Sequence, residues 1–326
     1  MAAVFREGGG MLSVEAFMRL ALYDPAHGYY SRNVKTVGRG GDFSTSATLH
    51  GALGEAIADW IDQKEVIEVG AGDGSLAESV LSTMGWWRRR KVKYRIVDTS
   101  APLVTRQRER LARFGSRVEW HASVAGALAA SDGMADVFSN ELVDAFPAVS
   151  LRWNAGLEHW EEVFVSDDGA ETFRRSEFQA GWQPNVDGQR IERHRSFHEW
   201  WEEWLPRWKR GRMLTIDYGA PFPEVYHRRP MGTLRAYFAQ MRLDGAGEFY
   251  QRAGRQDLTA DVNFTDLANW GETLGLSETR LRTQREFLLG MLPGLEARAA
   301  NDAALGFLLD EAGAGGAFCV LEQQRT

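Results

Sequence analysis

The stretch VIEVGAGDGSL, residues 66–76, constrains the fold of this chain more than any other segment. An apolar run reaches the acid Glu68, and glycine then occupies every second position, at Gly70, Gly72 and Gly74. The helical pattern SLAESVLSTM follows, so the segment predicts a strand, a tight turn and a helix. Such turns often lie against nucleotides, because glycine lets the backbone approach a ligand closely. A turn that only closes a strand–helix unit is the alternative.

After this turn, strand-like and helical segments alternate at intervals of about 25–30 residues, which is typical of a parallel doubly wound sheet. The sequence therefore predicts an α/β domain over residues 63–326, preceded by a helical and loop extension over residues 1–62. Segments within 150–265 lack the alternation. Together with the extension, they are expected to cover the carboxyl edge of the sheet, where ligands bind. The expected strands lie within residues 65–70, 93–100, 117–123, 135–147, 211–219 and 316–323.

Composition excludes several classes of protein. Net charge is −7, from 38 basic and 45 acidic residues, which argues against nucleic-acid binding. A single cysteine, Cys319, makes no internal disulfide, and the scattered histidines indicate no metal site. No secretory signal is expected from MAAVFREGGG, and no apolar run approaches the roughly 20 residues that span a bilayer. These features predict a cytoplasmic protein without membrane insertion.

The spacing of the glycines distinguishes between nucleotides. A dinucleotide site uses G-x-G-x-x-G, whereas the third glycine here comes one residue earlier, and no Gly-Lys-Ser/Thr marks a phosphate loop. An acid followed by x-G-x-G-x-G resembles the class I S-adenosylmethionine-dependent methyltransferases. That resemblance implies S-adenosylmethionine as cofactor and an acid after the second strand, where Asp98 stands, as acceptor for the ribose hydroxyls. NAD binding stays a weaker alternative.

Seven motifs occur in order between residues 13 and 323, and together they resemble the MidA family. These methyltransferases are related to the mitochondrial complex I assembly factor that dimethylates arginine. The resemblance implies a Rossmann-like class I methyltransferase fold, with a mostly parallel seven-stranded sheet, that methylates a protein arginine. The motifs are LYDPAHGYY, GRGGDFSTS, VIEVGAGDGSL, SNELVDAFP, IDYG, TLRAY and DLTADVNF.

The resemblance also implies where the site residues stand. Glu68 and the three glycines would form the main cofactor loop. A second group would lie beside the cofactor, and a third would follow the fourth strand and face the methyl group. The second group is Gly41, Asp42 and Phe43, and the third is Asn140, Glu141 and Asp144.

Some positions depart from the family pattern. Ala47 and Thr48 replace a usual Pro-Glu pair, and Gln240 stands where histidine is usual. A methyltransferase for a different acceptor therefore stays open, as does a non-catalytic cofactor-binding assembly factor for a respiratory or other complex. A protein substrate, such as a respiratory-complex subunit, is the expected partner.

An arginine acceptor needs acidic groups, because a guanidinium is protonated at neutral pH and has no free lone pair. Carboxylates must hold it and accept a proton as the new bond forms. Glu141 and Asp144, three residues apart after a strand, are the expected catalytic pair, and Asp42 is a further candidate. Alternatively, Glu141 caps a following helix and Asp144 pairs with a surface arginine.

The aromatic residues form two groups. Tyr29, Tyr30 and Tyr237 are candidates for substrate binding, because aromatic rings stack on adenine or guanidinium. Equally, they pin the loops to the core. A second group recurs at helical spacing and predicts one buried helix face, with a groove for a protein substrate as the alternative. This group is Phe197, Trp200, Trp201, Trp204 and Trp208.

Overall fold

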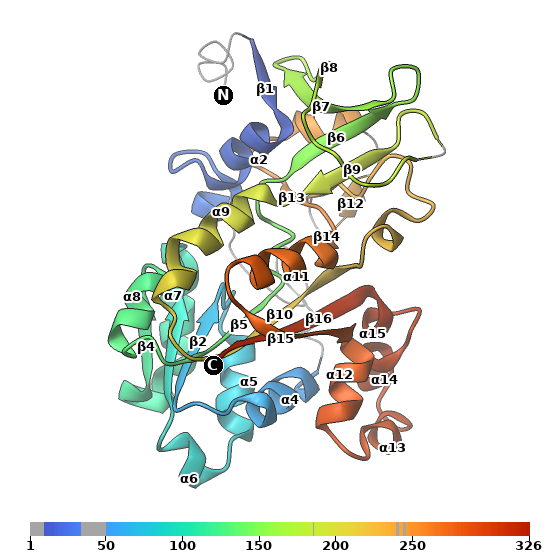
Figure 1. Ribbon diagram of the computed structural model, residues 1–326. Coiled ribbons are helices and arrows are strands. Elements are labelled where there is room, and N and C mark those ends of the chain that lie inside the picture. Colours follow the sequence, from blue (N-terminus) through green and yellow to red (C-terminus); the bar gives the residue numbers. More distant parts are fainter. Residues whose placement is uncertain (1–9, 34–49, 185, 239–240, 244–245) are drawn as a thin grey trace. The chain divides into compact units, whose positions relative to one another are not determined.

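The computed structural model describes residues 10–33, 50–184, 186–238, 241–243 and 246–326 (Figure 1). These residues form two compact units. Unit 1 takes its residues from 10–33, 143–199 and 220–266, and unit 2 from 50–142, 200–219 and 267–326. Residues 50–62, which were assigned to the N-terminal extension, thus belong to the same unit as the glycine turn.

Unit 2 contains a mixed sheet with the strand order β15-β16-β10-β5-β2-β3-β4. The pairs from β10 to β4 are parallel, and β16 is antiparallel to both β10 and β15. The prediction of an α/β fold is confirmed at the level of this mixed sheet. The strands are β2 (Glu65–Val69), β3 (Lys93–Val97), β4 (Val118–His121), β5 (Asp136–Asn140), β10 (Gly211–Ala220), β15 (Ser277–Thr283) and β16 (Phe318–Arg325).

All the helices of unit 2 except α6 bury apolar residues in the core. In α5, for example, Leu76, Ala77, Val80 and Leu81 are buried at helical spacing and join the same core cluster as Tyr94 of β3. The helices are α4 (Ala52–Trp60), α5 (Ser75–Thr83), α6 (Trp86–Arg89), α7 (Ala101–Leu111), α8 (Val124–Ala130), α12 (Gln284–Met291), α13 (Leu295–Ala299), α14 (Ala303–Leu309) and α15 (Ala314–Ala317).

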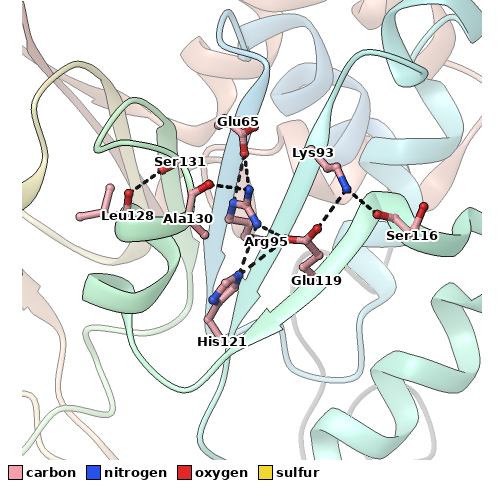
Figure 2. Close-up of polar contacts among 9 residues, drawn as sticks. All are labelled: Glu65, Lys93, Arg95, Ser116, Glu119, His121, Leu128, Ala130 and Ser131. Atoms are coloured by element: carbon pink, nitrogen blue, oxygen red, sulfur yellow. Dashed lines mark hydrogen bonds and ion pairs between the residues drawn. The ribbon is translucent and has the colours of Figure 1, made fainter.

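The other face of the same strands carries a buried polar network (Figure 2). Arg95 of β3 forms ion pairs with Glu65 of β2, at 2.9 Å between Nη2 and Oε2, and with Glu119 of β4. Its guanidinium also donates to the carbonyl of Ala130 at the end of α8 (3.0 Å). An unpaired buried cation would be costly, so these partners explain how an arginine is accommodated inside the sheet. Burial and the charge of Arg95 lower the pKa of His121.

Unit 1 is built mainly from antiparallel strands. One sheet has the order β1-β7-β6-β9, with β8 on β7, and a second has the order β12-β11-β13. Strands β6 and β7 form a hairpin, and Ser13 caps α2 by accepting from the Ala16 N–H (3.2 Å). The elements are β1 (Met11–Ser13), α2 (Val14–Tyr23), β6 (Val149–Asn154), β7 (His159–Ser166), β8 (Glu171–Arg175), β9 (Arg190–Arg193), β11 (Arg235–Phe238), β12 (Met241–Leu243), α10 (Ala246–Gln251), β13 (Asp257–Thr259) and β14 (Val262–Asn263).

Two helices, α9 (Arg195–Trp204) and α11 (Phe264–Thr273), contain residues of both units. The predicted aromatic face around α9 is buried, since Phe197, Trp201, Trp204 and Trp208 are at most 2% exposed. The prediction of a buried helix face is therefore confirmed for Phe197, Trp201 and Trp204, while Trp208 is buried beyond the end of α9. None of the helices in the described part of the chain has the length and apolar character needed to cross a membrane.

Candidate active site

The carboxyl ends of three neighbouring strands lie level at one edge of the sheet in unit 2. Val69, the last residue of β2, is in register with Val97 of β3 and Ser139 of β5. The parallel register brings together three predicted cofactor residues that are far apart in the sequence. They are Gly70, Asp98 and Asn140.

The turn after β2 has the conformation that its glycines predict. Gly70, Gly72 and Gly74 have φ values of 71°, 54° and 83°, in the left-handed region that favours glycine. A Cβ on Gly70 would also lie 2.8 Å from Cδ1 of Leu142. The turn then leads directly into α5, with Gly74 at the N-cap.

Asp98 is held in place by two hydrogen bonds. Its Oδ1 accepts from the Ser100 N–H (2.9 Å), and its Oδ2 accepts from the side-chain amide of Gln107 (2.7 Å). Burial raises the pKa of the Asp98 carboxyl, and these bonds oppose the shift. The carboxylate is thus oriented by the chain itself at the position predicted for ribose binding.

Gln107 links the two predicted cofactor segments, and the sequence analysis missed it. The side chain is fully buried, and its Nε2 donates both to Asp98 and to the carbonyl of Gly72 (2.8 Å). Its Oε1 accepts from Nε1 of Trp120 (3.1 Å). A signal was present, because Gln107 lies between Leu103 and Leu111 on the buried stripe of α7, where an apolar residue would be expected.

Glu68 is buried beneath the turn. It is 2% exposed, and its Oε2 accepts from the hydroxyl of Tyr94 (2.7 Å). Burial, together with the charges of Asp98 and Asp73, raises the pKa of this carboxyl to about 8, although the hydrogen bond from Tyr94 opposes the shift. Glu68 thus carries a proton for much of the time at neutral pH. Its predicted part in the cofactor loop stays a prediction.

The turn after β5 places Glu141 in an unusual conformation. Its φ is +52°, although it is not glycine, and its N–H donates to the Ile216 carbonyl (2.9 Å). Asn140 donates from Nδ2 to Oε1 of Glu141 (3.1 Å). The Asn140 Oδ1 is buried and has no hydrogen-bond partner among the described residues. No helix follows within residues 141–148, so the alternative in which Glu141 caps one is wrong.

Asp217, in the IDYG motif of β10, supports this turn and was also missed. It is fully buried, and its carboxylate accepts from the N–H groups of Leu142 (3.1 Å) and Tyr218 (2.9 Å). The acid that ends the buried run of β10 was the available signal.

Asp144 lies in unit 1, where it is 7% exposed. Its backbone carbonyl accepts from the Ala260 N–H (3.0 Å) and from the buried ring of His194. Burial lowers the pKa of His194 to about 4. Burial alone would lower the pKa of Arg235, but the charges of Asp261 and Asp144 contribute to a net rise. Asp144 is therefore buried and interacts with the charge of Arg235, and the alternative in which it pairs with a surface arginine stays untested.

Tyr30 contacts an acid of unit 1 that is far away in the sequence. Its hydroxyl donates to Oδ1 of Asp257 (2.8 Å), whose pKa is raised to about 6 by burial. The ring of Tyr30 stacks on Tyr23, with centroids 5.6 Å apart, and meets Tyr29 edge to face. These contacts pin the segment to the core of unit 1. Substrate binding by Tyr29 and Tyr30 stays a prediction, as it does for the half-buried Tyr237 of β11.

Six residues named in the sequence analysis lie outside the described residues. They are the cofactor candidates Gly41 and Phe43, the catalytic candidate Asp42, and the departures Ala47, Thr48 and Gln240. In the remainder of the chain, no group of three or more histidine, cysteine, aspartate or glutamate side chains is placed to hold a metal ion.

The edge of unit 2 fits S-adenosylmethionine. The left-handed turn at Gly70 lets the backbone lie close to a ligand, and the Asp98 carboxylate suits a ribose diol. The buried Asn140 Oδ1, which has no partner in the described part of the chain, provides a further acceptor at the same edge.

Comparisons with known proteins agree with this fit. Residues 52–281 match the family described as "Putative S-adenosyl-L-methionine-dependent methyltransferase". The mitochondrial protein arginine methyltransferase NDUFAF7 homolog of Caenorhabditis elegans is 26% identical, over 78% of this chain and 67% of its own length. The mitochondrial protein arginine methyltransferase NDUFAF7 of Danio rerio is 25% identical, over 91% of this chain and 77% of its own length.

A solved structure has a similar fold and holds the product form of the cofactor. It is a protein from Burkholderia thailandensis bound to S-adenosyl-homocysteine, with a TM-score of 0.80 and 28% identity. The similarity covers 99% of this chain and 90% of the other. S-adenosylmethionine is therefore the cofactor. Because the family match covers well over half of the sequence, this chain belongs to the family of S-adenosylmethionine-dependent methyltransferases that includes the MidA proteins.

Proposed function

We propose that this methyltransferase transfers a methyl group to an arginine side chain of a protein substrate. The observation that carries the proposal is the placement of Glu141, whose carboxylate stands at the carboxyl edge of the sheet in unit 2. The next residue, Leu142, lies against Gly70 of the cofactor turn. The names of the two relatives, which are 25–26% identical, support arginine as the acceptor.

A left-handed φ at a residue with a Cβ costs about 1–2 kcal/mol. Glu141 keeps this conformation because Asn140, Ile216 and Asp217 hold the turn from both sides. Strain that the surroundings maintain is common at functional sites. Glycine at position 141 would avoid the strain but would lose the carboxylate. Glu278 has the same φ on exposed β15, so the strain supports a role for Glu141 only together with its place at the cofactor edge.

The chemistry needs alignment and a proton acceptor. When bound, S-adenosylmethionine supplies a methyl group already activated on a sulfonium. Glu141 accepts hydrogen bonds from the guanidinium, turns one nitrogen toward the methyl group and takes the proton that this nitrogen releases as the N–C bond forms. Breaking of the S–C bond leaves S-adenosyl-homocysteine, so atoms and charge balance. Alignment alone supplies up to about 7–11 kcal/mol of the barrier.

Asp144, which follows Glu141 by three residues in the sequence, is the second acid that we propose for the acceptor. Its side chain is buried, and its backbone lies beside His194. A buried carboxylate binds a guanidinium strongly when the pair is well oriented. We include a respiratory-complex subunit among the proposed substrates; the cytoplasmic location stays a prediction.

The experiment compares labelled methyl transfer by the natural chain, by Glu141→Gln and by the matched control Glu278→Gln. Glu278 is exposed on β15 and has the same φ of +52°. The substrate is a lysate from cells that lack this chain. We expect labelled methylarginine after hydrolysis, a loss of about 10²–10⁴-fold in rate for Glu141→Gln, and no loss for Glu278→Gln. Cofactor affinity, measured by calorimetry, should change by only a few-fold.

Other results have defined meanings. Label on another residue type or on a small molecule would contradict arginine as acceptor and leave the methyltransferase family intact. Cofactor binding without labelled product would favour a non-catalytic assembly factor. Unchanged turnover in Glu141→Gln would remove Glu141 from the catalytic residues.

A further inference from the structure

Two tryptophans stand exposed at one end of unit 2. Trp86 and Trp87 in α6 are 49% and 74% exposed, and Trp87 has the largest exposed fraction of the large hydrophobic residues described. Their rings pack edge to face with centroids 4.4 Å apart. Exposed tryptophans are unusual, because a tryptophan side chain has a large apolar surface that is mostly buried in folded proteins. The pair is therefore a candidate surface for contact with a partner outside the described residues.

The tryptophans are followed at once by cations. The segment GWWRRRKVK, residues 85–93, contains five arginines and lysines and no acid, in a chain whose net charge is −7. The guanidinium of Arg90 lies over the ring of Trp86 at 4.4 Å from its centroid. We call residues 85–91 the Trp-Arg tip. It combines an apolar aromatic surface with a positive one.

The Trp-Arg tip is presented from firm anchors. Met84 before it and Val92 after it are both buried in the core of unit 2. The side chain of Arg88 donates to the carbonyl of Ile61, and that of Arg89 donates to the carbonyl of Leu81 (3.3 Å). The exposed rings are thus held in place before any partner binds, which lowers the entropic cost of association.

The position of the tip leaves the cofactor edge free. α6 ends shortly before β3 begins at Lys93, so the tip lies at the amino edge of the parallel strands, as its place at an end of unit 2 in Figure 1 shows. The cofactor turn and Asp98 follow the carboxyl ends of the same strands. A partner bound at the tip would therefore not compete with the cofactor.

We propose that the Trp-Arg tip docks the protein on a membrane surface that contains anionic lipids. Tryptophan rings favour the interface between headgroups and acyl chains, and clustered arginines and lysines are attracted to anionic headgroups. Stable binding to a membrane generally needs two signals, and here they are the apolar tryptophan rings and the cluster of positive charges. A single-stranded nucleic acid fits less well, because Arg90 covers Trp86 and the two rings pack edge to face rather than forming a stacking platform.

The test is flotation with vesicles of phosphatidylcholine alone and of phosphatidylcholine with phosphatidylserine. The natural chain should float only with the anionic vesicles, and raised salt should weaken the binding. The paired substitutions Trp86→Ser with Trp87→Ser, and Arg90→Glu with Lys91→Glu, should each weaken binding by about tenfold or more. Two control variants should bind as the natural chain does. The first is Phe307→Ser on α14, where the aromatic ring is about as exposed as that of Trp86. The second is Lys209→Glu with Arg210→Glu, which makes the same change in charge outside the Trp-Arg tip.

Affinity for S-adenosylmethionine, measured by calorimetry, should be the same in all the variants, which shows that each is folded. Absence of binding to anionic vesicles overturns the proposal. The proposal also fails if the control variants lose as much vesicle binding as the variants of the Trp-Arg tip. Tighter binding of a single-stranded oligonucleotide at the tip, or dimerisation that depends on the tryptophans without any vesicle binding, also overturns it.

Discussion

Two turns meet at the carboxyl edge of the sheet in unit 2, and they reach left-handed backbone conformations by different means. The turn after β2 uses glycine at Gly70, Gly72 and Gly74, where the conformation costs little. The turn after β5 uses Glu141, whose Cβ makes the same conformation unfavourable. Glycine suffices where the backbone must only approach a ligand. Glu141 adds a carboxylate at the same edge, which glycine could not supply.

The two turns are also supported from different elements. The first is tied to α7 through Gln107 and through an ion pair between Asp73 and Arg110 (2.7 Å). The second is tied to β10 through the Ile216 carbonyl and Asp217. A helix thus positions the cofactor turn, and the sheet itself positions the acid that we propose for catalysis. This difference predicts that damage to each turn affects a different measured quantity.

The largest effect is expected for Gln107→Leu. The change leaves the carbonyl of Gly72, the Asp98 carboxylate and the indole N–H of Trp120 without their shared partner. We expect a loss of about 2–4 kcal/mol in the free energy of unfolding and a roughly tenfold weaker affinity for S-adenosylmethionine. Denaturant unfolding and calorimetry measure the two quantities.

Gln256→Leu is the matched control, because Gln256 is equally buried and donates to the carbonyls of Glu248 and Phe249 in unit 1. It should destabilise the protein without changing cofactor affinity. If both variants lower cofactor affinity equally, Gln107 has no special role at the cofactor turn.

A smaller effect is expected for Gly70→Ala, which tests whether the first turn depends on glycine. Gly70 has a positive φ, and a Cβ added there would be crowded. Gly115 also has a positive φ, but an added Cβ would lie in open space. Gly85 has a φ of −53°, and an added Cβ there would lie in open space as well. Alanine should destabilise these positions in that order, by about 1–3 kcal/mol at Gly70 and by little at Gly85. Only Gly70→Ala should weaken cofactor binding. Equal destabilisation at all three positions would contradict the conformational explanation.

The sequence predicts the first turn well because its requirements are local. Alternating glycines after an apolar run specify a backbone conformation whatever surrounds them, and strand–helix alternation brings Asp98 level with them. Gln107 was missed because its partners at Gly72 and Trp120 are 35 and 13 residues away. The bond between Tyr30 and Asp257 spans 227 residues, so no local pattern reveals it.

The second turn was predicted only in part, for a physical reason. The position of Glu141 after a strand follows from the hydrophobic pattern, but its left-handed φ does not, because glutamate itself disfavours that conformation. The conformation is imposed by Asp217, which lies 75 residues from Leu142. The alternative that treats Glu141 as a helix cap follows from an ordinary local preference. Tertiary contacts overrule it.

The smallest effect on the free energy of unfolding, and the one that tests the comparison most directly, is expected for Glu141→Gly. If the glutamate is kept in spite of strain, glycine should raise the free energy of unfolding, by up to about 1 kcal/mol, while methyl transfer is lost. Glu278→Gly, at the same φ of +52° on exposed β15, should give a similar gain with transfer intact. A variant of Glu141 that is less stable than the natural chain would mean that its hydrogen bond with Asn140 outweighs the strain. The two turns would then differ in their contacts and not in backbone cost, and the argument from strain to catalysis at Glu141 would fail.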